Sequence, residues 1–548
     1  MKIGFSQILH FDKEVFNGFT IANSCCFSVK RENHSTFGKE SSVLHKVREE
    51  WKTRVGFLLA AIGCAVGLGN IWRFPYVVYK SGGGAFFIPY LVAIFFVGLP
   101  LMILEFGLGH KEQGAAPTAF YRVNKSFEFP AWWAVLFTSF GVLCYYNVIL
   151  SWCINYLVYA FDFSWGNDPA TFFSKQFLQE SGNPFSINGF RWPIVVGLAF
   201  VWALVWFTLI RGVSKGIEIA TKAFIPVLII IVTFLVLWSL TLPGAGEGIK
   251  TYLTPDFSKI WDNEIWRNAF GQVFFSLSLG YGMMIAYASY LPRKTDINVN
   301  AGIVTFSNSA FEVFAGFAVF SVLGFMAIKS GKPVSEVVAQ GPGLSFIAYP
   351  QAINELPFGI LGKQIFGILF FMALFIAGIT SSFALMECFV TAAQDKFSWN
   401  RKKLVHISCI ISFLLGLVFT TRAGVYWLDI VDNFINKFGV VCIAFLECVL
   451  VARVFGHKKF LEYVNKHSSA NVGLLWKFSI CVFIPIILIV MLVTGVWESV
   501  RAPYGGYSWN AVLSIGVGAL VLTLIVALFF TRARWIDIDF KHIAKETE

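Results

Sequence analysis

The sequence contains few charged residues for its length. Asp, Glu, Lys and Arg make up 14% of its 548 residues, whereas a soluble domain contains about 25%. Hydrophobic residues make up 57%, and the mean hydropathy is +0.68. This shortage of charge excludes a soluble globular protein and indicates a chain that lies mostly within a lipid bilayer.

Residues 1–45 lack the continuous apolar core of about 7–15 residues that a secretory signal peptide needs. Their mixed polar composition instead predicts a cytoplasmic tail that is largely disordered. A misassigned start codon is the alternative explanation for this stretch.

Long apolar runs occupy most of the remaining chain. A helix that crosses a bilayer needs about 20 apolar residues, and twelve runs reach this length. They lie near residues 54–80, 84–110, 131–160, 192–211, 217–241, 266–291, 299–328, 363–395, 403–421, 424–453, 474–498 and 507–531. We predict one all-α integral membrane domain of twelve transmembrane helices over residues 46–533, followed by a cytoplasmic tail over residues 534–548.

The net charge of +11 does not indicate a nucleic-acid partner, because the basic residues gather between the spans on one side. An even number of spans places both termini on that side, and an excess of Lys and Arg is typical of cytoplasmic segments. The basic segments include Lys46–Arg54, Arg293–Lys294, Arg401–Lys403, Lys458–Lys459 and Arg532–Arg534. We expect a multi-pass protein of the cell's inner (plasma) membrane with both termini in the cytoplasm.

The predicted external loops contain no cysteine, which excludes an external disulfide framework. The two N-x-S/T sequences, at Asn33 and Asn124, fall on the predicted cytoplasmic side and do not indicate glycosylation. Both absences favour the membrane of a bacterium or an archaeon.

The first apolar run is interrupted by the sequence GCAVGLGNIWRF at residues 63–74. Each of its three glycines lowers helix propensity by about 1 kcal/mol, and Asn70 and Arg73 place polar groups in the run. Backbone in hydrocarbon must satisfy its own hydrogen bonds unless it lines a polar site. We therefore predict that the helix opens near Gly67–Gly69 and offers carbonyls and amides to an ion and a small solute.

A second interruption, SLSLGYG at residues 276–282, lies in the sixth run. If spans 1–5 and 6–10 are inverted repeats, the first and sixth spans are equivalent, and paired interruptions then indicate a binding site at the membrane midplane. Glycines that merely allow close helix packing are the alternative. Two clusters five helices apart, each beside hydroxyl or amide side chains, disfavour that alternative.

The sequence resembles the neurotransmitter:sodium symporters, which include bacterial amino-acid transporters of the leucine-transporter type and animal transporters of monoamines, GABA and glycine. The resemblance runs from about Arg48 through the twelfth span. Its motifs are WxTRxGF at 51–57, AVGLGNIWRFP at 65–75, GGGAFFIPY at 82–90, GLPLMILE at 98–105, YYNVILSW at 145–152, GQVFFSLSLGYG at 271–282, AGITSS at 377–382 and LDIVD at 428–432. It implies a 5+5 inverted repeat with broken first and sixth helices, and transport by alternating access.

The resemblance implies two sodium sites made of backbone carbonyls and polar side chains. The first site would comprise Ala65, Asn70, Ser276 and Asn308, completed by the substrate carboxylate. The second would comprise Gly63, Val66, Ala377, Thr380 and Ser381. For the hydroxyl groups, the alternative is a hydrogen bond back to a carbonyl of their own helix.

Glu312 is an acid within the seventh run, four residues after Asn308. An acid within a membrane span is costly and by default indicates function. Animal members use chloride and carry a small neutral residue here. The resemblance thus implies that Glu312 supplies the negative charge and that chloride is not required. A change in the protonation of Glu312 during the transport cycle would also allow proton countertransport. The alternative is a protonated, hydrogen-bonded acid in the core.

Gly67 distinguishes between substrate classes. Monoamine transporters of the family place an aspartate here to pair with the substrate amine, whereas glycine admits a solute that brings its own carboxylate. The resemblance implies a substrate site formed by Ala65, Gly67, Leu68, Gly69, Val142, Tyr146, Phe275, Ser276, Ser278, Tyr281, Ser381 and Leu385. Its mostly apolar lining predicts a neutral amino acid with an aliphatic or aromatic side chain. Tyr281 stands where the leucine-type site has phenylalanine, so its hydroxyl either trims the pocket or recognises a polar group.

The resemblance also implies two gates. The outer gate would comprise an Arg73–Asp432 pair with Gln272 nearby, and Tyr146 and Phe275 as a lid. The inner gate would comprise an Arg48–Asp395 pair supported by Trp51 and Tyr290. Ion pairs suit gates because an exposed pair contributes only about 0–1 kcal/mol and so can open and reform.

We expect a secondary active symporter that couples sodium entry to uptake of a neutral amino acid. Its partners would be sodium ions, the amino acid and the lipid bilayer, and the chain would be a monomer or a homodimer. A transport-inactive amino-acid sensor that signals through residues 1–45 is one alternative, and a channel is another. The sequence shows no nucleophile–base pair, metal cluster or phosphate-binding loop that would indicate an enzyme.

Overall fold

The computed structural model of the chain describes residues 48–337 and 341–536. Over these ranges the regular secondary structure is helical, and the only strand-like pairings are two isolated bridges, Gly83–Pro255 and Phe190–Thr421. The all-α prediction is confirmed for the described part of the chain. The tail predicted over residues 1–45, and residues 537–548 of the C-terminal tail, lie outside the described residues.

Ten helical segments of the described chain are long and apolar enough to cross a bilayer. They are η1–α6 (Gly84–Glu112), η3–α9 (Lys125–Tyr159), α11 (Trp192–Leu209), η6–α12 (Val213–Ser239), α16 (Ile297–Ser330), α19 (Ile360–Phe397), α20–η9 (Arg401–Thr420), α21–α23 (Gly424–Lys466), α24–η13 (Leu474–Gly506) and α26–α27 (Trp509–Arg532). Each coincides with one predicted apolar run. The other two predicted runs, the first and the sixth, are broken.

The first run forms two helices, α2 (Arg54–Ala65) and the pair α3–α4 (Leu68–Lys80), which are bent by 55° relative to each other. The break is at Val66 and Gly67, whose backbones are extended, with ψ of 103° and −168°. The predicted opening of this helix is therefore confirmed, and it begins one residue before Gly67.

The sixth run forms α14 (Asn263–Ser276) and α15 (Met283–Ala288), with residues 277–282 outside either helix. Ser278, Gly280 and Gly282 have φ of +56°, +77° and +76°. This left-handed backbone strains a side chain but not a glycine. The carboxylate of Glu105 accepts a hydrogen bond from the Gly280 amide at 2.8 Å and so replaces the intrahelical partner of that amide. The second predicted interruption is also confirmed.

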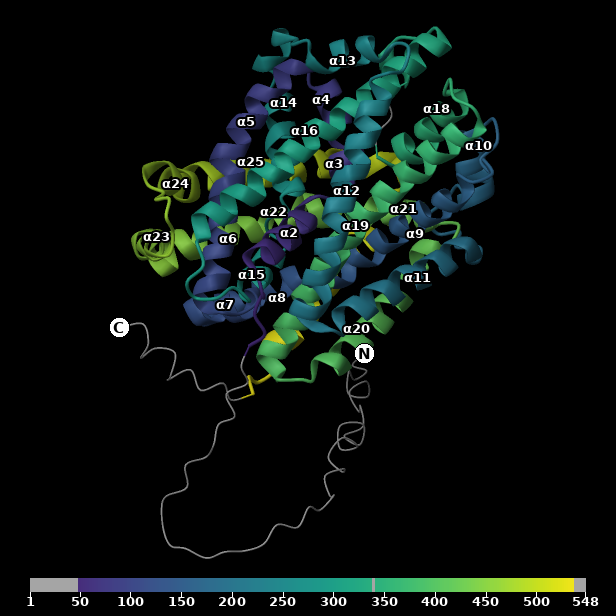
Figure 1. Cartoon of the computed structure of the whole chain (residues 1–548). Coiled ribbons are helices and arrows are strands. Elements are labelled where there is room, and N and C mark those ends of the chain that lie inside the picture. The colour runs from purple at the N-terminus through teal and green to yellow at the C-terminus, as the bar shows by residue number, and fades with distance from the viewer. Residues whose placement is uncertain (1–47, 338–340, 537–548) are drawn as a thin grey trace, which may run out of the picture. The chain divides into compact units, whose positions relative to one another are not determined.

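Two long unbroken helices hold the broken runs in place. α19 packs against α2, α12 (Glu218–Ser239) and α9 (Leu143–Tyr159), and α16 packs against α2 and α3 (Leu68–Trp72) (Figure 1). α15 packs against α19 and α6 (Leu99–Glu112). Polar side chains of α19 therefore reach carbonyls at the end of α2, and Asn308 of α16 reaches the Ser276 side chain at the end of α14.

A buried ion pair fixes the end of α19 near its last residue. Lys396 is fully buried and donates to the carboxylate of Glu128 at the start of α8 (Glu128–Leu136) and to the Phe530 carbonyl of α27 (Gly518–Arg532). The Trp535 indole donates to the other Glu128 oxygen at 3.2 Å. Because a buried charge needs partners, these bonds join α19, α8 and the last helix at one point.

Candidate functional site

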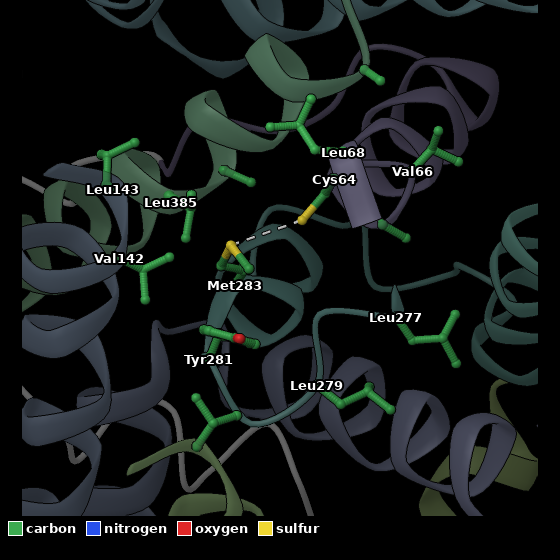
Figure 2. Packing of buried hydrophobic residues seen from close by; sticks show 14 of the residues in the cluster. Cys64, Val66, Leu68, Val142, Leu143, Leu277, Leu279, Tyr281, Met283 and Leu385 are labelled. Carbon is green, nitrogen blue, oxygen red and sulfur yellow. Dashed lines mark hydrogen bonds between the residues drawn. The ribbon is translucent and has the colours of Figure 1, made fainter. Parts of the chain in front are cut away.

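A cavity of about 130 Å³ opens between the two helix breaks. All the residues predicted for the substrate site line it: Ala65, Gly67, Leu68, Gly69, Val142, Tyr146, Phe275, Ser276, Ser278, Tyr281, Ser381 and Leu385. Figure 2 shows the side chains of Leu68, Val142, Tyr281 and Leu385, from four separate segments, around one region. The structure therefore brings these residues together, although they span more than 300 positions of the sequence.

Two sulfur-containing residues also line the cavity and were not predicted. Cys64 and Met283 point toward each other in Figure 2, with Sγ and Sδ 3.9 Å apart. Cys64 directly precedes Ala65, and Met283 directly follows Gly282. Because both residues adjoin a predicted break, the sequence could have indicated that they line the cavity. Both add polarizable apolar surface to the wall.

One end of the cavity presents hydrogen-bond donors to a ligand. A Cβ placed on Gly67 would lie 3.3 Å from the Tyr146 hydroxyl and 3.4 Å from the Ser381 hydroxyl. Leu68 and Gly69 begin α3, so their amides have no intrahelical acceptor. The Leu68 amide instead contacts the Tyr146 hydroxyl. A phenol and the first amides of a helix, around an open backbone, can bind a carboxylate.

The side chains predicted for the first sodium site lie together beneath this cavity. Asn70 Nδ2 donates to Asn308 Oδ1 at 2.9 Å, and Asn308 Nδ2 donates to the Ser276 hydroxyl at 3.1 Å. Asn70 and Asn308 are buried, and Ala65 lines the same cavity. This set supplies oxygen ligands, which hard cations prefer.

Glu312 lies directly against this set and is fully buried. Its carboxylate accepts hydrogen bonds from Asn70 Nδ2 at 3.0 Å, Gln272 Nε2 at 3.4 Å and the Tyr90 hydroxyl at 2.8 Å. Tyr90 was not predicted, although it ends the GGGAFFIPY motif. These partners are neutral donors, so the carboxylate charge, when present, remains available to a neighbouring cation.

The residues predicted for the second sodium site lie where α19 meets the end of α2. Thr380 Oγ1 donates to the Gly63 carbonyl at 2.7 Å and to the Ala377 carbonyl at 3.1 Å. Ser381 Oγ donates to the Cys64 carbonyl at 3.1 Å. Val66, another predicted ligand, directly follows Ala65, the last residue of α2. The hydroxyls therefore reach across to α2 as well as back to their own helix.

The residues predicted for the inner gate are in contact. Arg48 donates to Asp395 at 2.7 Å and to the Ser289 hydroxyl at 2.7 Å, and its guanidinium lies 4.7 Å from the centre of the Tyr290 ring. The Trp51 amide donates to the Tyr290 carbonyl at 3.1 Å. Burial lowers the pKa of Arg48, but Asp395, together with Tyr290 and Glu387, offsets this and holds that pKa above its ordinary value.

Arg73 and Asp432, which are predicted to pair in the outer gate, form no ion pair in the described chain, and their pairing in another conformation stays a prediction. The Arg73 guanidinium lies over the Phe275 ring, 4.7 Å from its centre. Asp432 Oδ1 accepts hydrogen bonds from the Tyr145 hydroxyl at 2.5 Å and from Asn436 Nδ2 at 2.8 Å. Each residue is therefore satisfied by another partner.

The chain matches the sodium:neurotransmitter symporter family over residues 48–168 and 164–537. An uncharacterized sodium-dependent transporter of Methanocaldococcus jannaschii is 43% identical over 477 residues, which cover 87% of this chain and 96% of the relative. A sodium-dependent dopamine transporter of Caenorhabditis elegans is 31% identical, covering 89% of this chain and 88% of the relative.

A human relative, the sodium- and chloride-dependent neutral and basic amino acid transporter B(0+), is 33% identical over 527 residues, covering 84% of this chain and 81% of the relative. The relatives named here are sodium-dependent transporters, and none is named as an enzyme. The match extends over both helix breaks and over the residues that line the cavity. The chain therefore belongs to the sodium:neurotransmitter symporter family.

Proposed function

We propose that this chain is a sodium-coupled symporter that imports a neutral amino acid by alternating access and does not require chloride. The observation that carries the proposal is the cavity between the two helix breaks, with Gly67 at its donor-rich end. The proposal includes twelve transmembrane helices in two inverted repeats of five plus two further helices. It also includes both termini on the cytoplasmic side of the cell's inner (plasma) membrane.

The substrate carboxylate would lie against the amides of Leu68 and Gly69 and the hydroxyl of Tyr146. Its amine would meet carbonyls at the ends of the broken helices, at Ala65 and Phe275. No Lys, Asp or Glu lines the cavity, and Arg73 is the one basic residue among its lining residues in the described chain. An unpaired charge on the substrate side chain would therefore be penalised, which favours aliphatic or aromatic substrates.

Sodium would bind as a transported co-substrate at two places. The first is the Asn70, Ser276 and Asn308 set beside the substrate carboxylate, and the second is the Thr380 and Ser381 set beside the end of α2. Oxygen atoms from opened backbone bind a cation without burying additional charge. A substrate carboxylate next to the first ion would couple amino-acid binding to sodium binding.

Chloride independence rests on Glu312. Several animal relatives are named as sodium- and chloride-dependent transporters. Here a buried carboxylate lies 3.0 Å from Asn70, next to the proposed first sodium site. A fixed negative charge at this position would replace the charge that a bound chloride ion supplies.

The two gates support an outward-facing conformation. The Arg48–Asp395 pair is formed, and this closes the cytoplasmic side of the proposed pathway. Arg73 and Asp432 each have other partners, so the proposed outer pair is not formed. Alternating access requires that the inner and outer pairs are never both broken at the same time.

Purified full-length chain in proteoliposomes should accumulate a radiolabelled neutral amino acid when an inward sodium gradient is imposed. Replacing external chloride by gluconate should leave the uptake unchanged, and replacing sodium by potassium should abolish it. Tight sodium-dependent binding without accumulation would instead identify a sensor. Unitary currents would identify a channel, and equal uptake in potassium would contradict the proposal.

Replacing Arg48 by alanine should shift the chain toward an inward-open state by up to about fivefold, because a partly hydrated ion pair contributes about 0–1 kcal/mol. The readout is the alkylation rate at Cys388, which is fully buried near Gly282, followed by peptide mass spectrometry. Arg54→Ala is the matched control, since Arg54 donates to Asn300 and not to Asp395. Equal alkylation rates in Arg48→Ala and the control would argue against the gate.

A further inference from the structure

The hydroxyl of Tyr281, a residue that lines the cavity, is bonded to a partner outside the cavity lining. It donates to Asn436 Oδ1 at 2.6 Å, and Asn436 lies in η10 (Ile435–Val440), 155 residues further along the chain. A phenol has one proton to donate, so this bond commits it. The sequence had left open whether this hydroxyl would trim the pocket or recognise a polar group, and the structure shows a third use.

Asn436 is oriented by a second bond. Its Nδ2 donates to Asp432 Oδ1 at 2.8 Å, one helical turn earlier. An asparagine whose amide nitrogen is bound to a carboxylate presents its oxygen to the other side, toward Tyr281. Three side chains therefore form a continuous line from the cavity wall to the acid proposed for the outer gate.

The backbone of Tyr281 is held from the opposite side. Its carbonyl accepts a hydrogen bond from Thr138 Oγ1 at 3.2 Å and a weak one from Cys388 Sγ at 3.6 Å. Tyr281 is only 7% exposed. Because the residue is fixed at both its carbonyl and its hydroxyl, its ring is a rigid wall beside Val142 and Leu385 (Figure 2).

We infer that Asn436 is a specificity-determining positioning residue. Its hydrogen bond to the Tyr281 hydroxyl holds the Tyr281 ring across the cavity and thereby limits the size of the substrate side chain. The inference rests on the proposed function. A larger side chain has to turn the ring, and turning the ring breaks the bond to Asn436 and frees Asn436 from its orientation toward Asp432. The size of the substrate side chain would thus be linked, through Tyr281 and Asn436, to the acid of the proposed outer gate.

Removing the Tyr281–Asn436 hydrogen bond should change substrate preference. A net hydrogen bond contributes roughly a fivefold change in an equilibrium constant, so Tyr281→Phe and Asn436→Ala should each raise the ratio of tryptophan to alanine affinity about fivefold. The double variant should show no further increase, because the two changes remove the same bond. The measurement is sodium-dependent binding of radiolabelled alanine, leucine and tryptophan to the purified full-length chain.

Tyr145→Phe is the matched control. It removes a phenol that is bonded to Asp432 Oδ1 and also contacts Asn436, but it keeps the Tyr281–Asn436 bond, and Tyr145 does not line the cavity. It should leave the tryptophan-to-alanine ratio within about twofold of the original chain. Should Asn436→Ala fail to fold, Tyr281→Phe decides alone, since it deletes one oxygen atom and keeps the ring.

The outcomes separate the two proposals. If the unaltered chain binds none of the three amino acids in sodium, the proposed function fails and this inference falls with it. If the unaltered chain binds them but Tyr281→Phe leaves the ratio unchanged, the inference alone is overturned. An equal change of the ratio in Tyr145→Phe would also overturn it, because the effect would then come from Asp432 and not from the cavity wall.

Discussion

Replacing Gly67 by aspartate should reduce sodium-dependent binding of neutral amino acids by at least a hundredfold. The new carboxylate would occupy the donor-rich end of the cavity, where the Tyr146 and Ser381 hydroxyls lie within 3.4 Å of a Cβ at this position. It would repel the substrate carboxylate, and an uncompensated buried charge costs about 3–5 kcal/mol. Binding is measured with a radiolabelled amino acid on the purified full-length chain.

Gly67→Asn is the matched control for charge, because asparagine has the same shape as aspartate. It should lose only the part of the affinity that is due to crowding. The backbone at Gly67 has a φ of −129°, which any residue adopts without strain, so neither variant distorts the helix break directly. If Gly67→Asp bound neutral amino acids as well as Gly67→Asn does, the proposed position of the substrate carboxylate would be wrong.

Replacing Glu312 by alanine should make uptake depend on chloride. Without the carboxylate, Asn70, Gln272 and Tyr90 keep their donors in a buried space that no longer contains a negative charge. We expect uptake to fall more than a hundredfold in gluconate, since losing one partner of a buried charge interaction costs about 3–5 kcal/mol. Chloride, held by the same donors, should restore part of it.

Glu312→Gln is the matched control for side-chain volume. Glutamine removes the charge but fills the volume in which chloride would sit, so added chloride should not rescue this variant. Uptake by proteoliposomes in chloride or gluconate distinguishes these cases. Chloride-dependent uptake by the unaltered chain, or equal uptake by Glu312→Ala in both anions, would contradict the role given to Glu312.

The helix breaks were predictable from the sequence because they depend on local chemistry. Glycines beside Asn70 in the first run, and Ser278 beside Gly280 and Gly282 in the sixth, conflict with an apolar spanning helix, and the structure opens at both places. The cavity lining followed, because residues beside two facing breaks share one space. The same reasoning would have found Cys64 and Met283 if it had been extended by one residue on each side.

The partners of long side chains were not predictable in this way. The Tyr281–Asn436 bond joins residues 155 positions apart, and the Glu128–Lys396 pair joins residues 268 apart. Neither pair has a sequence pattern that distinguishes it from many other polar pairs. Only the packing of η10 against the second break, and of α8 against the end of α19, brings them within bonding distance.

The Arg73–Asp432 pair is not formed in this structure, for a different physical reason. A gate residue must have partners in two conformations, and a single sequence contains both sets. Asp432 is held here by Tyr145 and Asn436, and Arg73 lies over Phe275. Sequence reasoning names the residues of such a gate but not the conformation in which they meet.

A structure of the full-length chain determined with sodium and its best-binding neutral amino acid would show whether the substrate binds between the two helix breaks. We expect the substrate carboxylate at the amides of Leu68 and Gly69, with a sodium ion between it and the oxygens of Asn70 and Asn308. An amino acid bound outside the two helix breaks, or bound there with its carboxylate directed away from Gly67, would contradict the account.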